Sequence, residues 1–280
     1  MIGEALAASI DALRAAGVED PRLDAEVLLA EATGWDRAAL ATDPEAEIPP
    51  PAARRFAEMV RRRLRREPVA YIVGRRGFRH LELAVDPRVL IPRPETELLV
   101  ELALELRPAS VLDVGTGSGA VALAIAAELP GCAVTATDTS AAALEVAAAN
   151  AETLGLASRV RLIAGAVPED GAFDLIVANL PYVAEAEWPS LQPEVTEWEP
   201  REALLAGPDG LDAIRAFLRR VRPSSPLWRT KAKSAEGVVA LEVGEGQAVA
   251  VAGLMEEAGF EAIDVRKDLA GIERVVVGRT

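Results

Sequence analysis

The sequence has almost none of the two residues that most often supply metal ligands and nucleophile activation. Cys132 is the only cysteine among 280 residues, and His80 is the only histidine. A single cysteine cannot form an intrachain disulfide, and one residue of each kind is too few for a typical zinc site or a histidine-based triad. The composition therefore argues against hydrolase and metalloenzyme chemistry, and His80 is interpreted as an exposed hairpin residue without a catalytic role.

Long hydrophobic runs are also absent. No stretch approaches about eighteen uninterrupted apolar residues, the length that a membrane-spanning helix needs. Residues 1–16 carry Glu4 and Asp11 within a helical apolar pattern, which indicates an amphipathic helix rather than a signal peptide. We expect a cytoplasmic protein that does not enter a membrane.

Positive charge is scarce, since the chain carries 30 Lys and Arg against 44 Asp and Glu, a net charge of -14. Contact with many phosphates normally requires a basic face, so a protein partner is expected and a direct nucleic-acid substrate is not. Two basic islands stand out. Residues 61–66 are interpreted as the solvated face of a helix and residues 228–233 as a surface loop.

What the chain does contain is enough apolar sequence, half of all residues, for a sizeable core divided between two domains. Residues 1–75 predict a helical domain, with apolar residues at helical spacing over 2–16, 23–33 and 52–65. Residues 76–95 predict a β-hairpin connector. Residues 96–280 alternate strands with helices, which is typical of a doubly wound α/β sheet.

A glycine loop opens that alternating region. The segment VLDVGTGSGA, residues 111–120, is a short buried strand followed by glycines and a helical stretch over 121–129. Glycines allow backbone to approach a ligand closely, and the helix start offers free N–H groups. Gly115, Gly117 and Ala120 also fit the dinucleotide pattern G-x-G-x-x-A. The third glycine, Gly119, and Asp113 fit better with the loop of S-adenosylmethionine enzymes.

Two further strand ends are expected to meet the same ligand. Strand 133–137 ends in Asp138, at about the interval where an acidic residue reaches a ribose hydroxyl pair. The alternative, Asp138 as a helix N-cap, is weakened because Ser140 is the better cap and would leave Asp138 free. Strand 160–163 precedes Gly165 and Ala166, where the adenine would lie.

The tetrapeptide Asn179-Leu180-Pro181-Tyr182 follows the apolar run 175–178. A strand ending in Asn-x-Pro-Tyr can hold a planar NH2 group, because an Asn side-chain oxygen and a backbone carbonyl can accept its hydrogens. Such a group is a poor nucleophile and has to be gripped in line with a methyl donor. An isolated motif of this kind is more often an ordinary strand-to-loop corner, but the glycine loop upstream of it favours amino-group methylation.

The remaining elements would complete the sheet. Helices are predicted over 211–221 and 247–258, and a strand over 237–243. Strands about 262–265 and 274–277 predict a final antiparallel pair. Residues 223–236 form a polar connection whose length suggests mobility.

Further motifs identify a family. The chain resembles, nearly end to end, the HemK/PrmC family, methyltransferases that modify a glutamine side-chain amide in class-1 peptide release factors. The residues that carry the resemblance are LIPRPETE at 90–97 together with Asn179–Tyr182, EPVAYI at 67–72, VDPRVL at 85–90, LQPEV at 191–195, EPR at 199–201 and DGL at 209–211.

The resemblance implies a class I S-adenosylmethionine-dependent methyltransferase fold, Rossmann-like with an antiparallel C-terminal strand, plus a helical domain that binds the release factor. It implies methylation of the N5 nitrogen in the Gly-Gly-Gln motif, which tunes translation termination. S-adenosyl-L-methionine would be held by Gly115, Thr116, Gly117, Ser118, Gly119, Asp138, Ala166 and Asn179. The substrate glutamine would be bound by Asn179, Leu180, Pro181 and Tyr182, which are also the expected catalytic residues.

Two positions depart from the family pattern. The family usually has Pro where Leu180 stands, and Leu there also occurs in ribosomal RNA adenine dimethyltransferases. An adenine-N6 methyltransferase acting on RNA or DNA is therefore the alternative. Many relatives carry Asp and a bulky residue at Gly165-Ala166, so weaker cofactor binding is expected here. A protein that binds release factors or S-adenosylmethionine without catalysis is a third hypothesis.

Overall fold

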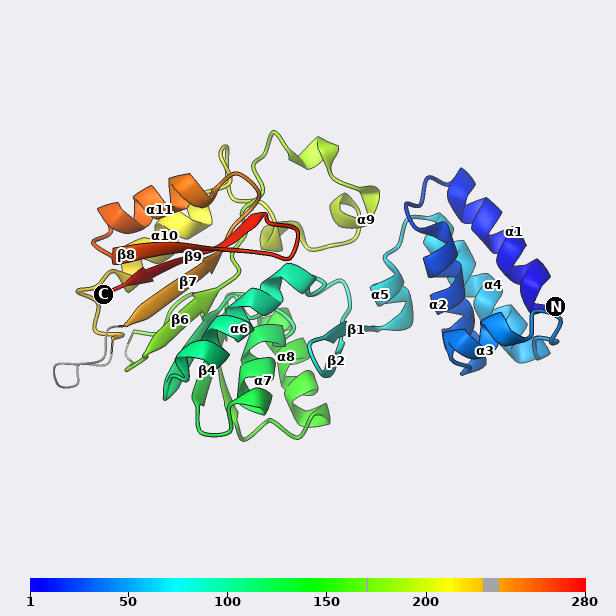
Figure 1. Cartoon of the computed structure of the whole chain (residues 1–280), viewed down its shortest axis with the longest axis horizontal. Helices are drawn as coiled ribbons and strands as arrows, with labels where there is room; N and C mark the ends of the chain where they lie inside the picture. The colour runs from blue at the N-terminus through cyan, green and yellow to red at the C-terminus, as the bar shows by residue number, and fades with distance from the viewer. Residues whose placement is uncertain (170, 229–236) are drawn as a thin grey trace. The chain divides into compact units, whose positions relative to one another are not determined.

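The chain forms two compact units in the computed structural model, which describes residues 1–169, 171–228 and 237–280. One unit comprises Met1–Arg75 together with Gln192–Trp198, and is called the helical unit here. The other comprises Arg76–Leu191 and Glu199–Thr280, and is called the sheet unit. Figure 1 draws both units and labels most of their elements.

The helical unit buries the apolar faces of its amphipathic helices against one another. Leu28, Leu29, Phe56 and Met59 lie at the centre of its core, and the three predicted helices are confirmed. Three short helices were not predicted, because six, five and four residues are too few to display an apolar period. The helices are α1 (Ile2–Ala15), α2 (Pro21–Thr33), α3 (Arg37–Thr42), α4 (Pro50–Leu64), α5 (Val69–Val73) and α9 (Pro193–Thr196).

The arginine run at the end of α4 is not simply the solvated helix face that its sequence suggests. Arg61 is exposed and pairs with Glu58, as such a face would. Arg63, in contrast, is only 5% exposed. Its guanidinium donates to Asp24 at 2.7 Å and to Glu194 at 2.6 Å, so the interpretation is wrong for this residue.

Residues 192–198 belong to the helical unit although they lie far along the chain. Glu194 of α9 accepts from Arg63 and, with both carboxylate oxygens, from Arg66 at 2.8 and 2.6 Å. Trp198 Nε1 donates to the Arg65 carbonyl at 3.3 Å. Burial raises the pKa of Glu194, but hydrogen bonds from Arg66 and Arg63 outweigh it and hold the pKa below its ordinary value.

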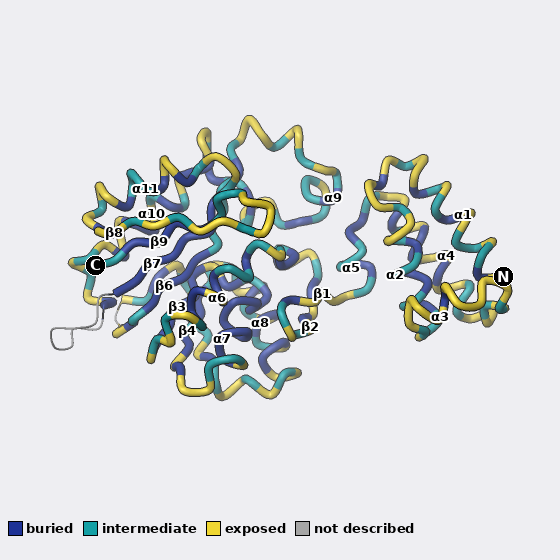
Figure 2. Tube along the Cα trace, viewed as in Figure 1, coloured by how far each residue is buried: buried dark blue, intermediate teal, exposed yellow. Residues whose placement is uncertain are grey.

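The sheet unit contains a seven-stranded sheet in the order β5-β4-β3-β6-β7-β9-β8. The first five strands are parallel, and β9 runs antiparallel to both β7 and β8, which confirms the predicted final pair. Figure 2 shows the central strands buried along their length. The strands are β3 (Ser110–Val114), β4 (Ala133–Asp138), β5 (Val160–Ala164), β6 (Leu175–Ala178), β7 (Val238–Glu242), β8 (Glu261–Lys267) and β9 (Glu273–Arg279).

Alternation along the strands divides the core into two layers. Val111 and Val177 pack with α6 and α7 on one face, while Leu112 and Ile176 pack with α10 and α11 on the other. Both faces are covered, which explains why the strands read as continuous apolar runs. The helices are α6 (Glu97–Leu106), α7 (Ala120–Glu128), α8 (Ala141–Thr153), α10 (Asp212–Val221) and α11 (Ala248–Glu257).

A hairpin of β1 (Arg75–Phe78) and β2 (Leu81–Ala84) precedes α6, and His80 is exposed at its turn, as predicted. Trp228 corrects another prediction, because it is buried rather than part of a surface loop. Its indole Nε1 donates to the Val221 carbonyl at 2.9 Å, and its ring meets Phe260 edge-on. The rest of that basic island, and most of the connection 223–236, falls in residues 229–236, outside the described residues.

Candidate active site

The glycine loop after β3 and the tetrapeptide after β6 lie against each other. The two strands are parallel neighbours, so their carboxyl ends meet at one edge of the sheet. Gly115 has φ 75°, and a Cβ there would lie 3.3 Å from Leu180 Cδ2 and 3.5 Å from the Asn179 carbonyl oxygen. A larger residue would therefore be both strained and crowded, and only glycine suits this contact.

Gly117, two residues on, faces open space instead. Its φ is 56°, and a Cβ there would meet nothing within 4 Å. Gly117 also lines the cavity described below. The loop thus presents bare backbone to that cavity, as a loop that seats a ligand must.

Asp113 holds the glycine loop from beneath. Its Oδ2 accepts from Thr116 Oγ1 at 2.6 Å and from the Ala122 N–H at 3.2 Å, which joins the loop to the first turn of α7. Burial raises the pKa of Asp113 to about 6, and the hydrogen bonds oppose that rise. The carboxyl is an internal support of the loop and does not line the cavity.

Asp138 lies at the end of β4 and lines the cavity with Gly117 and Ser140. Ser140 caps α8 by accepting from the Ala143 N–H, as predicted. Asp138 is nevertheless not free, because its Oδ2 accepts from the Gly117 N–H at 2.9 Å and its Oδ1 from the Ser140 N–H at 2.8 Å. Each carboxylate oxygen retains a second lone pair for a hydroxyl donor.

Ala166, after β5, contributes backbone and a methyl group to the cavity wall. Its carbonyl accepts from Thr137 Oγ1 at 2.9 Å, which fixes the turn. Neighbouring Gly165 has φ 128° and, like Gly117, would meet nothing within 4 Å with a Cβ.

The tetrapeptide is held by side chains that come from two other parts of the sheet unit. Asn179 Nδ2 donates to Thr96 Oγ1 at 3.1 Å. The Tyr182 carbonyl accepts from Gln247 Nε2 at 2.9 Å. The Tyr182 side chain is partly buried, and burial raises the pKa of its phenol above the ordinary value.

The segment 91–93 is tied to the stretch after the tetrapeptide. Glu199 is buried, and its Oε2 accepts from the Ile91 N–H at 3.1 Å while its Oε1 pairs with Arg93. The two family motifs LIPRPETE and EPR are therefore physical partners. The contact brings Leu90 and Pro200 to the wall of the same cavity.

One cavity joins these parts. Among the predicted site residues it brings together Gly115, Gly117, Asp138, Ala166, Asn179, Leu180 and Pro181, whereas Thr116, Ser118, Gly119 and Tyr182 do not line it. Residues outside the predicted site set complete it. They are Arg88, Val89, Leu90, Val114, Thr139, Ser140, Ala143, Gly165, Pro200, Glu202 and Ala203.

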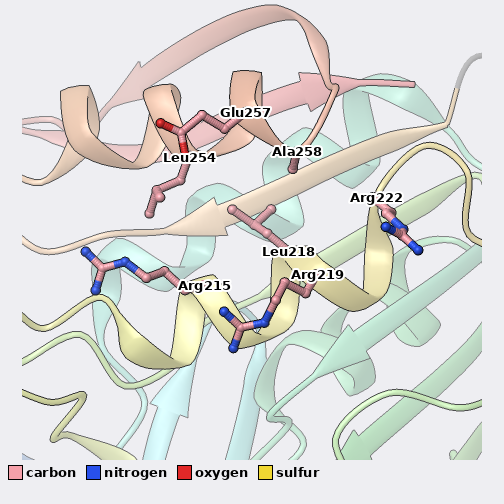
Figure 3. A pocket seen from close by; sticks show the side chains of 7 residues that line it. All are labelled: Arg215, Leu218, Arg219, Arg222, Leu254, Glu257 and Ala258. Carbon is pink, nitrogen blue, oxygen red and sulfur yellow. The ribbon is translucent and has the colours of Figure 1, made fainter.

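A second hollow lies between α10 and α11, away from the strand ends. Figure 3 shows Arg215, Arg219 and Arg222 on one side and Leu254 and Glu257 on the other. Arg215 is already paired with Asp209 and Asp212. No glycine loop or strand end reaches this hollow, so it is not the candidate site.

Metal chemistry has no ligand set in the described ranges, where no group of three or more His, Cys, Asp and Glu side chains could hold an ion. Within the same ranges, no helix has both the length and the apolar character needed to cross a membrane.

Known proteins are similar to this chain in sequence and in fold. Residues 4–74 match the family model of the PrmC N-terminal domain, and residues 94–193 match that of the methyltransferase small domain. A release factor glutamine methyltransferase of Cereibacter sphaeroides is 44% identical over 284 residues, 99% of this chain and 97% of the relative. One of the same description from Geobacter sulfurreducens is 42% identical, covering 94% and 91%. A methyltransferase structure from Pyrococcus furiosus shares the fold, with TM-score 0.51, 20% identity and coverage of 71% and 88%.

Proposed function

The chain belongs to the release factor glutamine methyltransferase family, and from that premise we propose that it methylates the glutamine of the Gly-Gly-Gln motif in class-1 release factors. The methyl group goes to the side-chain amide nitrogen, N5, and this modification tunes translation termination. The observation that carries the proposal is the contact of Gly115 with Asn179 and Leu180, which unites a ligand loop and an amide-binding motif at one cavity.

The residues present suit S-adenosyl-L-methionine as the cofactor. Gly117 and Gly165 expose backbone to the cavity, and the Asp138 carboxylate at its wall can still accept from hydroxyls. We assign the cofactor to Asp138, Ala166, Asn179 and the loop 115–119, of which Gly115 and Gly117 line the cavity and the other three residues shape the loop. When bound, the cofactor would supply an electrophilic methyl group, and the protein would hold the substrate nitrogen in line with it.

Asn179 and Leu180 hold the nucleophile in this proposal. Because Nδ2 of Asn179 is engaged by Thr96, its Oδ1 is the end that can accept from the substrate NH2 group. The Leu180 carbonyl is the second acceptor. Because this acceptor is a backbone group, leucine in place of the family's usual proline leaves its function intact. Both acceptors favour the positive charge that develops on nitrogen as it attacks, and the proton leaves afterwards.

Pro181 and Tyr182 complete the glutamine site. Pro181 lines the cavity and fixes the backbone beyond Leu180. The partly buried Tyr182 ring packs beside the amide plane and helps to exclude water from it.

The helical unit is the part that we assign to release-factor binding. It has its own core, and residues 1–75 coincide with the region that matches the PrmC N-terminal domain. The acidic net charge suits a protein partner better than a phosphate backbone. Release factors act in the cytoplasm, where we place this chain too.

The test incubates the purified protein with S-adenosylmethionine and a class-1 release factor, with ribosomal RNA in a parallel tube, and locates any added methyl group by mass spectrometry. Methyl on the Gly-Gly-Gln glutamine alone supports the proposal. Methyl on adenine alone would replace it with the adenine-N6 alternative that Leu180 raised, and no methyl on either would favour a binding protein without turnover.

A further inference from the structure

Glu242 is a buried carboxyl that none of the assigned roles uses. It ends β7, where alternation puts its side chain on the same face as Val238 and Ala240, the face that α6 covers. It is 2% exposed, and its Oε2 is the only buried side-chain nitrogen or oxygen in the described ranges without a hydrogen-bond partner. An uncompensated polar atom of this kind costs stability and calls for a functional reason.

The neighbours of Glu242 connect it to the glutamine site. The register of β6 and β7 pairs Ala178 with Leu241, so Glu242 ends β7 beside the point where Asn179 follows β6. The hydroxyls of Thr96 and Tyr182 are near enough to its carboxyl to lower its pKa. Thr96 Oγ1 in turn accepts from Asn179 Nδ2 at 3.1 Å. Glu242 is therefore linked to Asn179 through Thr96, and it lies next to Tyr182.

The chain of hydrogen bonds has a direction that ionised Glu242 would set. A carboxylate has no proton to donate, so it must accept the proton of the Thr96 hydroxyl. Thr96 Oγ1 then has only lone pairs left for Asn179, which has to present its NH2 group there. This leaves Asn179 Oδ1 as the amide end available to the cavity that Asn179 lines.

Resting on the proposed function, we propose that Glu242 is a positioning residue whose ionised carboxylate, acting through Thr96, keeps the Asn179 oxygen turned toward the substrate NH2 group. The opposite direction of these hydrogen bonds would prevent the reaction. With a proton on Glu242, the carboxyl can donate to Thr96, the Thr96 proton can turn to Asn179, and the amide can invert. Asn179 would then face the substrate with its own NH2, a donor against a donor.

Burial and the groups around Glu242 place its change from protonated to ionised near neutral pH. Burial is the main cause that raises the pKa of Glu242 to about 7; the Thr96 hydrogen bond lowers it, Glu95 raises it, and Arg274 and Tyr182 lower it. These are the groups that face the carboxyl from the segment before α6, from β9 and from the tetrapeptide. The ionised form, and with it the productive amide polarity, should gain population as the pH rises through about 7.

The first test compares Glu242→Gln and Thr96→Val with the unsubstituted protein and with Glu245→Gln, an exposed carboxyl three residues further on. Gln at 242 keeps the volume but can either donate or accept, so it no longer sets the direction. We expect kcat on the release factor to fall about tenfold in each of the first two variants, with KM for S-adenosylmethionine unchanged, and no further fall in their combination. Glu245→Gln should keep the original kcat.

The pH profile adds a readout that a merely structural role would not move. The kcat of the unsubstituted protein should rise through about pH 7, and that of Glu242→Gln should be flat there. Additive losses in the double variant, or a kcat and pH profile of Glu242→Gln equal to the original, would overturn the proposal.

A measurement without turnover separates this proposal from the proposed function. The side-chain NH2 signals of Asn179, assigned in NMR spectra by their loss in Asn179→Ala, should shift with a midpoint near pH 7 and lose that shift in Glu242→Gln. Absence of methyl transfer would refute the proposed function while this titration still tested the hydrogen-bond chain. Signals that do not titrate would refute the role of Glu242 even if the release factor were methylated.

Discussion

Burial of Glu242 should make the sheet unit less stable as the pH rises, and Glu242→Gln should remove that dependence. The pKa of Glu242 is raised by burial from 4.5 to about 7, so folding favours its protonated form. The stability that this preference adds to the folded state is fully present below pH 4.5 and is lost as the pH rises through 7. Because one pKa unit corresponds to about 1.4 kcal/mol, the loss amounts to about 3 kcal/mol by pH 8.

The assay takes the difference in unfolding free energy between Glu242→Gln and the unsubstituted protein, from urea unfolding between pH 4.5 and 8. Other titrating groups are common to both proteins and largely cancel. Fluorescence of Trp228, buried in the sheet unit, reports on the right part if Trp35, Trp188 and Trp198 are first replaced by Phe.

We expect the difference to move by about 3 kcal/mol in favour of the variant across this range. The unfolding free energy of Glu245→Gln should change with pH in parallel with that of the unsubstituted protein, because the Glu245 side chain is exposed. Parallel curves for Glu242→Gln as well would show that the carboxyl titrates alike in the folded and unfolded chain, and the reasoning from burial would fail.

Three further predictions concern the cavity and the helical unit. Asn179→Ala should lower kcat about a hundredfold, since it removes one preorganised acceptor; near-original turnover in the folded variant would contradict its role. Asp138→Ala should raise KM for S-adenosylmethionine, with activity partly recovered at high cofactor concentration, and no recovery at saturation would contradict the ribose assignment. Arg63→Met should destabilise the helical unit by about 3 kcal/mol in urea unfolding, because Asp24 and Glu194 lose a buried partner.

A matched control sharpens the Arg63 prediction. Exposed Arg61, two positions from Arg63 and paired only with Glu58, should tolerate Met within about 0.5 kcal/mol. An equal loss of unfolding free energy in Arg63→Met and Arg61→Met would mean that the buried ion pairs of Arg63 add nothing to the stability of the helical unit.

Elements with a strong local pattern could be predicted from the sequence. The strands around Leu112 and Ile176 were recognisable because each is a short apolar run followed by glycine or a turn residue. The same logic located the glycine loop, Asp138 and the tetrapeptide at one edge of the sheet, since carboxyl ends of parallel strands meet there. Short α3 and α5 escaped because their helical state depends on packing rather than on periodicity.

Features that depend on distant partners could not be predicted. Arg63 looks solvated among its basic neighbours, and its partner Glu194 lies 131 residues away. Trp228 looks exposed beside Arg and Lys, but its ring packs against Phe260. Glu242 did leave a readable signal, because it is an acidic residue at the carboxyl end of the otherwise apolar β7. Its link through Thr96 to Asn179 needed coordinates.

The membership of residues 192–198 in the helical unit bears on how this protein can be divided. The helical unit is not contiguous in sequence, so cutting the chain after residue 75 does not separate two complete parts. A fragment of residues 76–280 would carry Glu194 without Arg63 and Arg66, and a fragment of residues 1–75 would leave both arginines without it. If the helical unit binds the release factor as proposed, a chimaera designed to exchange that specificity between relatives would have to transplant both pieces together.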